Sequence, residues 1–203
     1  MNRHAMTQRF RAFTALALSF ALAACSGEPQ QNFDDAPLAG SAIGGAFTLV
    51  DKSGKTVRWQ DFAGKYRIVY FGYTFCPDAC PLDVGVMMQG YARFAKAQPG
   101  LAAGVQPIFI SIDPARDTPP VVGEFAAAFS PKLLGLTGSQ AQVDGAAKAF
   151  RVYVARGTGT PGGYLMDHSR LTYLMGPRGQ PIALLPTDKG AGAVAADLAK
   201  WVK

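Results

Sequence analysis

The sequence has few of the residues that carry metal or redox chemistry, and it has little charge. Its 203 residues include three Cys and two His, and Asp, Glu, Lys and Arg together make up 17%. Since 49% of the residues are hydrophobic, a disordered chain is excluded and one buried core is expected. The formal net charge is +6, but no two Lys or Arg residues are adjacent and no basic stripe alternates with aromatic residues. The sequence therefore predicts no nucleic-acid binding.

The chain also lacks a hydrophobic run of the length that a membrane span requires. Its most apolar stretch, residues 12–24, has thirteen residues. A helix that crosses the hydrocarbon needs about 20 residues. Because the stretch follows a basic segment with Arg3, Arg9 and Arg11, residues 1–24 are predicted to form an export signal.

The end of this segment, Leu22-Ala23-Ala24-Cys25, resembles the lipobox of bacterial lipoproteins, in which the Cys becomes the lipidated first residue of the mature chain. An uncleaved signal anchor and ordinary cleavage are the alternatives. Residues 25–41 are polar and are predicted to form a flexible tether between the lipid on Cys25 and a soluble domain at 42–203. We therefore expect a lipoprotein in the bacterial cell envelope that is membrane-anchored through Cys25 and faces the oxidising periplasm.

The hydrophobic pattern of residues 42–203 predicts strands that alternate with helices. The runs at 67–72 and 105–112 are continuous, apolar and β-rich, which is typical of strands buried on both faces. This order indicates an α/β sandwich with a mixed central sheet and an N-terminal β-hairpin. The other expected elements are hairpins at 46–59 and 171–185, helices at 81–97, 119–129, 141–150 and 191–202, strands at 133–136 and 151–155, and a Gly-rich loop at 157–163.

Two of the cysteines lie between a predicted strand and a predicted helix, where α/β folds place their ligand sites. In the segment FGYTFCPDACP, Cys76 and Cys80 are four residues apart, so both sulfurs are able to face the same side. Pro81 fits the first helical position, which makes Cys80 the expected N-cap. The positive end of the helix dipole is then expected to stabilise thiolates. The pair is suited to a disulfide or to one soft metal ion.

His168 adds a third potential ligand. It is the only histidine besides His4, and it lies in the segment MDHS after the Gly-rich loop. Two Cys and one His suit copper, because thiolates favour Cu(I) and imidazole helps to retain Cu(II). Zinc with a fourth water or Asp ligand is an alternative, and so is a plain disulfide beside an unrelated histidine. Spacing alone does not bring His168 to the cysteines, so the fold must do so.

The segments around these residues resemble the SCO/SenC family of thioredoxin-fold copper chaperones, which assist cytochrome c oxidase assembly. The resemblance spans residues 42–203 and rests on YFGYT at 70–74, CPDACP at 76–81, SIDPARDTP at 111–119 and DHS at 167–169. It implies a thioredoxin-like fold and one copper ion per chain bound by Cys76, Cys80 and His168. It also implies delivery of copper to the dinuclear copper site of the oxidase, or thiol reduction of that site. The implied partner is the copper-bearing subunit of cytochrome c oxidase or another envelope copper protein.

Two features depart from the family pattern. Members commonly have a transmembrane anchor, whereas this chain has Cys25 in a lipobox-like segment. Phe75 stands where some members carry His or another polar residue, so it is expected to exclude water without adding a ligand. Tyr73 and Tyr164 are expected either to line the site or to pack in the core.

Several acidic residues near the motifs are candidates for supporting roles. Asp78, between the cysteines, is a candidate for tuning the charge at the metal. Asp167 is a candidate for orienting His168 through a hydrogen bond. The segment with Asp113, Arg116 and Asp117 is predicted to form a structural turn with an Arg–Asp pair and a helix cap.

The sequence thus predicts a membrane-tethered copper metallochaperone. Copper is expected to leave by ligand exchange, with His168 departing on its loop. The alternative is a thiol–disulfide oxidoreductase in which Cys76 and Cys80 are the redox-active pair and reduce cysteines of an envelope partner. The spacer of three residues between them, instead of two, argues against a general thioredoxin role. No classical enzymatic activity is expected.

Overall fold

The computed structural model describes residues 32–160 and 163–203, so the predicted export signal and Cys25 lie outside the described residues. Within those two ranges, no helix combines the length and apolar character needed to cross a membrane.

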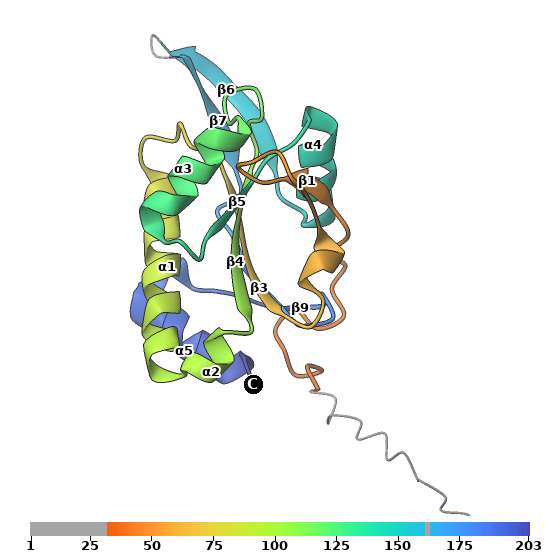
Figure 1. The fold of residues 1–203 in the computed structure, drawn as a ribbon, viewed down its shortest axis with the longest axis vertical. Helices are drawn as coiled ribbons and strands as arrows, with labels where there is room; N and C mark the ends of the chain where they lie inside the picture. Colours follow the sequence, from red (N-terminus) through yellow and green to blue (C-terminus); the bar gives the residue numbers. More distant parts are fainter. Residues whose placement is uncertain (1–31, 161–162) are drawn as a thin grey trace, which may run out of the picture. The chain divides into compact units, whose positions relative to one another are not determined.

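A mixed five-stranded sheet in the order β5-β4-β3-β8-β9 forms the centre of the fold (Figure 1). Strand β3 (Tyr66–Gly72) is parallel to β4 (Val105–Ser111), which is parallel to β5 (Leu134–Leu136). On its other side β3 is antiparallel to β8 (Thr172–Met175), which is antiparallel to β9 (Pro181–Leu184). All residues of β3 and β8 are buried, as expected for strands covered on both faces. The predicted α/β sandwich is confirmed.

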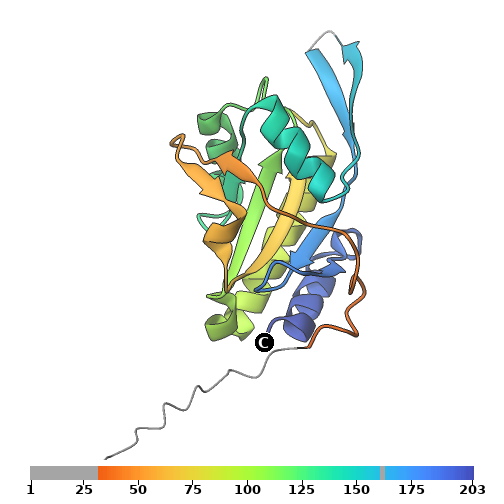
Figure 2. The same ribbon diagram turned by 90° about the vertical axis from the view of Figure 1, so that its right-hand side faces the viewer.

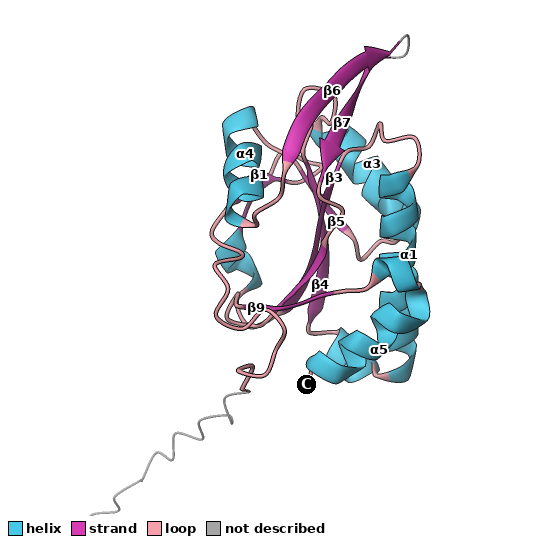
Figure 3. Ribbon diagram, turned by 180° about the vertical axis from the view of Figure 1, so that it is seen from behind, coloured by secondary structure: helices cyan, strands magenta, loops and turns pink. Residues whose placement is uncertain are grey.

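Helices cover both faces of this sheet. Helices α1 (Ala79–Ala97), α3 (Pro119–Phe129) and α5 (Ala191–Trp201) lie on one face (Figure 3). Helix α4 (Gln140–Ala149) lies on the other face, where Figure 2 shows it in front of the strands beside the N-terminal hairpin. The remaining elements of the sandwich are the hairpin strands β1 (Thr48–Val50) and β2 (Thr56–Arg58), helix α2 (Pro99–Ala102), and the 3-10 turns η1 (Trp59–Phe62) and η2 (Thr187–Lys189).

Alternating side chains of β3 reach the two layers of the core. Tyr70 points toward α1, where its hydroxyl donates a hydrogen bond to Asp83. Phe71 points the opposite way and packs on Phe150 at the end of α4, with 5.3 Å between ring centroids. The ring of Phe150 also contacts Trp59 and Tyr173. One strand therefore anchors both layers, and its carboxyl end leads directly into the cysteine segment.

Strands β6 (Val154–Thr160) and β7 (Gly163–His168) form a separate antiparallel hairpin beyond the end of the central sheet (Figures 1 and 2). The predicted loop at 157–163 is therefore wrong, because most of it belongs to this hairpin. Its Gly and Thr residues give no apolar alternation, so the sequence carries a weak strand signal. Gly157 allows close approach of the two strands, since a Cβ there would lie 3.1 Å from the carbonyl oxygen of Leu165, a tight contact.

Residues 32–41, which the sequence assigns to a flexible tether, pack on the domain. Phe33 and Ala36 are buried, and the Phe33 ring lies edge-on against Tyr66. The main-chain N–H of Leu38 donates to the carbonyl of Ile182 at 3.0 Å. Among the described residues, the folded unit thus begins before residue 42.

Candidate metal centre

The candidate ligands meet where β3 ends and β8 begins. Because β8 is antiparallel to β3, with Thr172 opposite Tyr70, the first residue of β8 lies at the carboxyl end of β3. The cysteine segment leaves β3 at this end, and β7 ends at His168, just before β8. Cys80 and His168 are 88 residues apart in sequence, yet their side chains are in contact. Sheet topology, which local spacing does not encode, brings them together.

Cys80 and His168 form the central contact of the site. The Cys80 sulfur lies 3.3 Å from Nε2 of His168, and the other ring nitrogen, Nδ1, lies 3.0 Å from the carbonyl oxygen of Ser169. Because a carbonyl only accepts, Nδ1 is the donor, and the neutral ring presents its Nε2 lone pair to Cys80. Burial lowers the pKa of His168, which favours this neutral form at pH 7. The imidazole is therefore in the state that a metal ligand requires.

The two thiols are both free, but their surroundings differ. Cys80 is fully buried, and this burial raises its pKa to about 12. Cys76 is partly exposed. Its own burial acts to raise its pKa, but hydrogen bonds from the main-chain N–H groups of Cys80 and Asp78 lower the pKa below its ordinary value. The sulfur of Cys76 lies 3.3 Å from the Cys80 nitrogen. Cys76 is therefore the thiol that ionises first.

Helix α1 begins earlier than the sequence indicates, and this explains the difference between the thiols. The N-cap is Asp78 and not Cys80, so Cys80 lies inside the first turn. The exposed side chain of Asp78 makes no capping hydrogen bond. The N–H groups of the first turn are thus open to another acceptor, and the Cys76 sulfur takes that role. The predicted stabilisation of a thiolate by the helix start applies to Cys76 and is wrong for Cys80.

Two tyrosines enclose the imidazole. The rings of Tyr70 and Tyr73 are nearly perpendicular to the His168 ring, each with its centroid 6.2 Å away. Tyr73 is buried and its hydroxyl also interacts with the thiol of Cys76. Of the two tyrosines that the sequence singles out, Tyr73 lines the site, whereas Tyr164 lies near the start of β7, at the opposite end of the strand from His168.

An ion pair that the sequence analysis missed fixes the segment after His168. Arg170 donates to both carboxylate oxygens of Asp83, with Nε–Oδ2 and Nη2–Oδ1 distances of 2.8 and 2.7 Å. Asp83 follows Cys80 by one turn of α1, and its side chain also accepts from Tyr70 at 2.9 Å. The pair therefore ties the end of β7 to the helix that carries Cys80. An acid on the inward, apolar face of α1 is the signal that could have revealed it.

Asp167 and the residues of the 113–117 turn do not contact the candidate ligands as directly as Tyr73 does. Asp167 is exposed and pairs with Ala155 in the hairpin, and the Ser169 carbonyl holds Nδ1 of His168 instead. The predicted ion pair between Arg116 and Asp113 is present. The N-cap of α3 is Thr118, whereas the side chain of Asp117 is buried and bonds elsewhere. Asp78 and Asp167 thus touch none of the three candidate ligands through a side-chain hydrogen bond that the structure records.

Cys76, Cys80 and His168 are the candidate donors for a soft metal ion. No three His, Cys, Asp or Glu side chains form a ready-made metal cage within 32–160 and 163–203. The 3.3 Å between sulfur and nitrogen nevertheless suits two ligands of one ion. At bond lengths of about 2.0–2.3 Å such ligands subtend an angle of roughly 100°. Two sulfurs and one imidazole suit copper or zinc. A metal would therefore use the preset Cys80–His168 pair and require Cys76 to close the set.

The mixed sheet, the helices on both faces and the cysteine pair at the start of α1 define a thioredoxin-fold protein, here with a histidine brought against the thiols. The chain belongs to the SCO1/SenC family, whose sequence profile matches residues 35–203. The expected family resemblance and the thioredoxin-like fold are thus confirmed.

Individual members of the family are similar to this chain in sequence and in structure. Protein SenC of Rhodobacter capsulatus is 48% identical over 144 residues, which are 69% of this chain and 62% of that protein, so the match leaves more than a third of the relative uncovered. The crystal structure of Arabidopsis thaliana ScoI with copper bound is 35% identical with a TM-score of 0.73, and the match covers 78% of this chain and 96% of that one. The structure of Bradyrhizobium japonicum ScoI with copper bound is 36% identical with a TM-score of 0.71, covering 79% and 99%.

Proposed function

We propose that this protein is a membrane-tethered copper chaperone that carries one copper ion on Cys76, Cys80 and His168. The observation that carries the proposal is the 3.3 Å contact between the Cys80 sulfur and Nε2 of His168, with Nδ1 engaged by the Ser169 carbonyl. Two similar structures contain copper, which supports copper over zinc. The acceptor is the dinuclear copper site of cytochrome c oxidase or another envelope copper protein, as the family resemblance implies.

Copper is the cargo of this site, and the three ligands contribute differently to its capture. The thiolate of Cys76 is partly exposed and forms at lower pH, so it makes the first bond. The buried Cys80 thiol loses its proton only when the metal displaces it, because its own pKa is about 12. Neutral His168 completes the set through Nε2 and helps to retain Cu(II).

Transfer requires a ligand of the acceptor to replace one of these three. The sequence-based expectation is that His168 leaves on a loop, but His168 is the last residue of β7. The following residues are fixed, because the N–H of Ser169 donates to the carbonyl of Tyr153 and Arg170 is paired with Asp83. We infer that the acceptor enters at the partly exposed Cys76, while Cys80 and His168 hold the ion until the exchange is complete.

Membrane attachment belongs to the same proposal. Lipid on Cys25 would hold the domain at the periplasmic side of the bacterial envelope, where its acceptor is embedded. Mass spectrometry of the mature protein from a bacterial membrane tests this directly: we expect an acylated N-terminal Cys25. A Cys25→Ser variant should be released from the membrane fraction, and its retention would contradict the anchor.

A second candidate function is thiol–disulfide exchange, because two free thiols in contact have opposite pKa shifts. The thiolate of Cys76 would attack a disulfide of a partner, and Cys80 would then displace the partner's reduced thiol, which leaves a Cys76–Cys80 disulfide. A turnover assay on metal-free protein separates the functions. A reductase works without copper and is unaffected by His168→Ala.

The deciding experiment for copper is an anaerobic titration of the reduced protein, with His168→Ala as the variant and Met166→Leu as the control on the same strand face. We expect one equivalent to bind tightly, with a thiolate-to-Cu(II) charge-transfer band that His168→Ala loses and Met166→Leu keeps. Weak, non-stoichiometric binding that does not depend on His168 would contradict the copper site and favour the reductase.

A further inference from the structure

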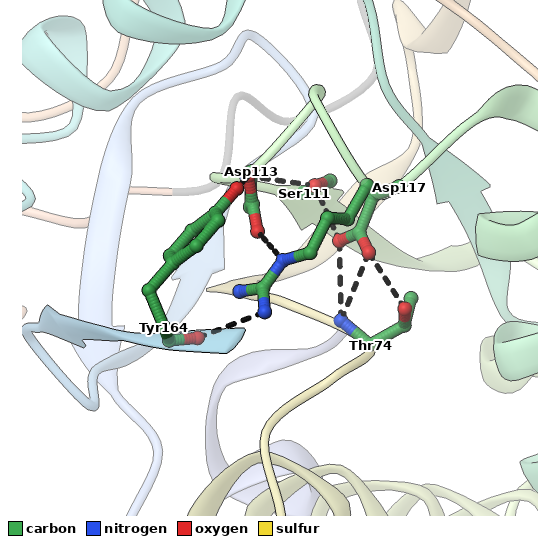
Figure 4. Close-up of polar contacts among 6 residues, drawn as sticks. Thr74, Ser111, Asp113, Asp117 and Tyr164 are labelled. Atoms are coloured by element: carbon green, nitrogen blue, oxygen red, sulfur yellow. Dashed lines mark hydrogen bonds and ion pairs between the residues drawn. The ribbon is translucent and has the colours of Figure 1, made fainter. Parts of the chain in front are cut away.

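The turn at residues 113–117 contacts both segments that carry the proposed ligands. It follows β4, the parallel neighbour of β3, so it lies at the same edge of the sheet as the cysteine segment. Figure 4 shows Asp117 of this turn facing Thr74, and Tyr164 of β7 beside Asp113. The turn thus lies where it can set the distance between the cysteine segment and β7, which are far apart in sequence.

Asp117 holds the cysteine segment. Its buried carboxylate accepts from the main-chain N–H of Thr74 at 3.1 Å and from the Thr74 hydroxyl at 2.6 Å. The hydroxyl of Ser111, the last residue of β4, also donates to Asp117 at 2.6 Å (Figure 4). Thr74 precedes Cys76 by two residues. The cysteine segment is therefore fixed to the turn by bonds that are shielded from water.

Arg116, the neighbouring residue, holds β7. Its guanidinium lies 3.7 Å from the centre of the Tyr164 ring, and Nη1 donates to the Tyr164 carbonyl at 2.8 Å. Nε is paired with Asp113, which in turn accepts from the Tyr164 hydroxyl at 2.7 Å. Arg116, Asp113 and Tyr164 thus form a closed ring of contacts. A lysine could not reproduce it, because an ammonium has no planar fork that stacks on the ring while its N–H groups bond Asp113 and the Tyr164 carbonyl.

The same guanidinium also faces the cysteine segment. Its centre lies 5.0 Å from the ring of Phe75 and 5.6 Å from that of Tyr73, which flanks the His168 ring. Arg116 therefore lies between the strand that carries His168 and the segment that carries Cys76. Such cation–aromatic contacts restrain the separation of the two surfaces.

The hairpin depends on contacts of this kind. Its strands pair with each other and form no ladder with the five-stranded sheet. Tyr164, Met166 and His168 share the inward face of β7, as their alternating burial indicates. Tyr164 is four residues before His168, which is about 13 Å of extended strand. A contact at Tyr164 therefore fixes the start of β7, and His168 lies at the other end of the same strand.

We propose that Arg116 is a positioning residue that sets the place of His168 relative to the cysteine pair. That the position of His168 affects copper binding rests on the proposed function. The placement itself is a property of the metal-free protein, so it is testable without copper.

The first test measures Cu(II) binding by reduced full-length protein in detergent. We expect Arg116→Ala and Tyr164→Leu each to weaken Cu(II) binding about tenfold or more, the usual effect of losing a contact that orients a metal ligand. Arg116→Lys should not restore it. Arg156→Ala is the matched control, since Arg156 also lies 3.7 Å from the Tyr164 ring but belongs to the hairpin itself.

A double-mutant comparison shows whether Arg116 acts through His168. In the His168→Ala background, Arg116→Ala should cause no further loss of copper affinity. Where the parent binds copper through His168, an equal loss in both backgrounds, or no loss caused by Arg116→Ala in the parent, would overturn the proposal.

The second test follows amide hydrogen exchange across residues 163–168 in metal-free protein, with the melting temperature as a check on folding. Arg116→Ala should speed this exchange about tenfold while exchange in β3 is unchanged, because local opening is then easier than global unfolding. Unchanged exchange across β7 would overturn the positioning role. If the parent binds no copper through His168, the proposed function fails, and this exchange measurement still decides the role of Arg116.

Discussion

The central sheet and the β6–β7 hairpin are held in place by different forces. In β3 every residue is buried, and rings such as Phe71 and Phe150 pack from both faces. In β7 every second residue is exposed, and the hairpin is fixed by Arg116 and by the segment around Arg170. The thiols follow the first region, in the segment that leaves β3 and in the first turn of α1, and the histidine belongs to the second region. We therefore expect core substitutions to lower stability with the site intact, and substitutions of the residues that fix the hairpin to alter the site at a smaller cost in stability.

The largest expected effect is on the sheet side of this comparison. Phe150→Ala should lower the free energy of unfolding by about 3–5 kcal/mol, because it removes a buried ring and leaves a cavity. Urea denaturation measures the loss, with exposed Tyr153→Ala as the neighbouring control. The copper absorption band of the folded variant should match the parent. A changed band would mean that the core and the site are not separable.

A smaller effect on stability is expected where the two regions meet. Asp83→Ala removes the partner of Arg170 and an acceptor of Tyr70. It should cost about 1–2 kcal/mol, since Arg170 is largely exposed and solvent screens the ion pair. Cu(II) affinity should nevertheless fall about tenfold, because the segment after His168 loses its anchor. Exposed Asp144→Ala on α4 is the control, and a loss of stability without a loss of affinity would contradict this role.

The two thiols, which lie close together at the end of β3, are expected to differ in reactivity. At pH 8, iodoacetamide should modify Cys76 at least about tenfold faster than Cys80, because the thiolate is the nucleophile. Hydrogen bonds offset the effect of burial on Cys76 and lower its pKa, whereas burial keeps Cys80 protonated. Mass spectrometry of metal-free protein gives both rates, and Cys76→Ser should leave only the slow reaction. Equal rates would contradict the asymmetry on which the proposed entry of the acceptor rests.

The smallest expected effect concerns the pH dependence of stability. Burial lowers the pKa of His168 in the folded protein. Below the ordinary histidine pKa of about 6.5, the unfolded chain therefore binds a proton that the folded chain does not. The stability that neutral His168 contributes is present above that pH and decreases as the pH falls below it. Denaturation of metal-free parent and His168→Gln between pH 8 and 5 should show this part of the decrease in the parent alone.

The sequence predicted the parts of the fold whose residues carry their own signal. Helix α3 follows directly from prolines in its first turn and from its apolar spacing, and β3 and β4 from their continuous apolar runs. The hairpin β6–β7 was missed because its Gly and Thr residues favour no element by themselves. The start of α1 was misplaced because Pro81 is compatible with more than one position in the first turn.

For the candidate site too, some features could be predicted from the sequence and others depend on the tertiary structure. The sequence by itself supplied the reactive groups: two thiols four residues apart, a lone distant histidine, and the order of motifs that marks the family. Tertiary structure alone decided which groups meet. The antiparallel pairing of β8 with β3 brings His168 to Cys80, the main-chain N–H groups at the start of α1 set Cys76 apart, and Arg116 and Arg170 hold the hairpin. Composition and spacing describe local preferences, whereas contacts between residues 88 apart depend on the register of strands that only the whole fold specifies.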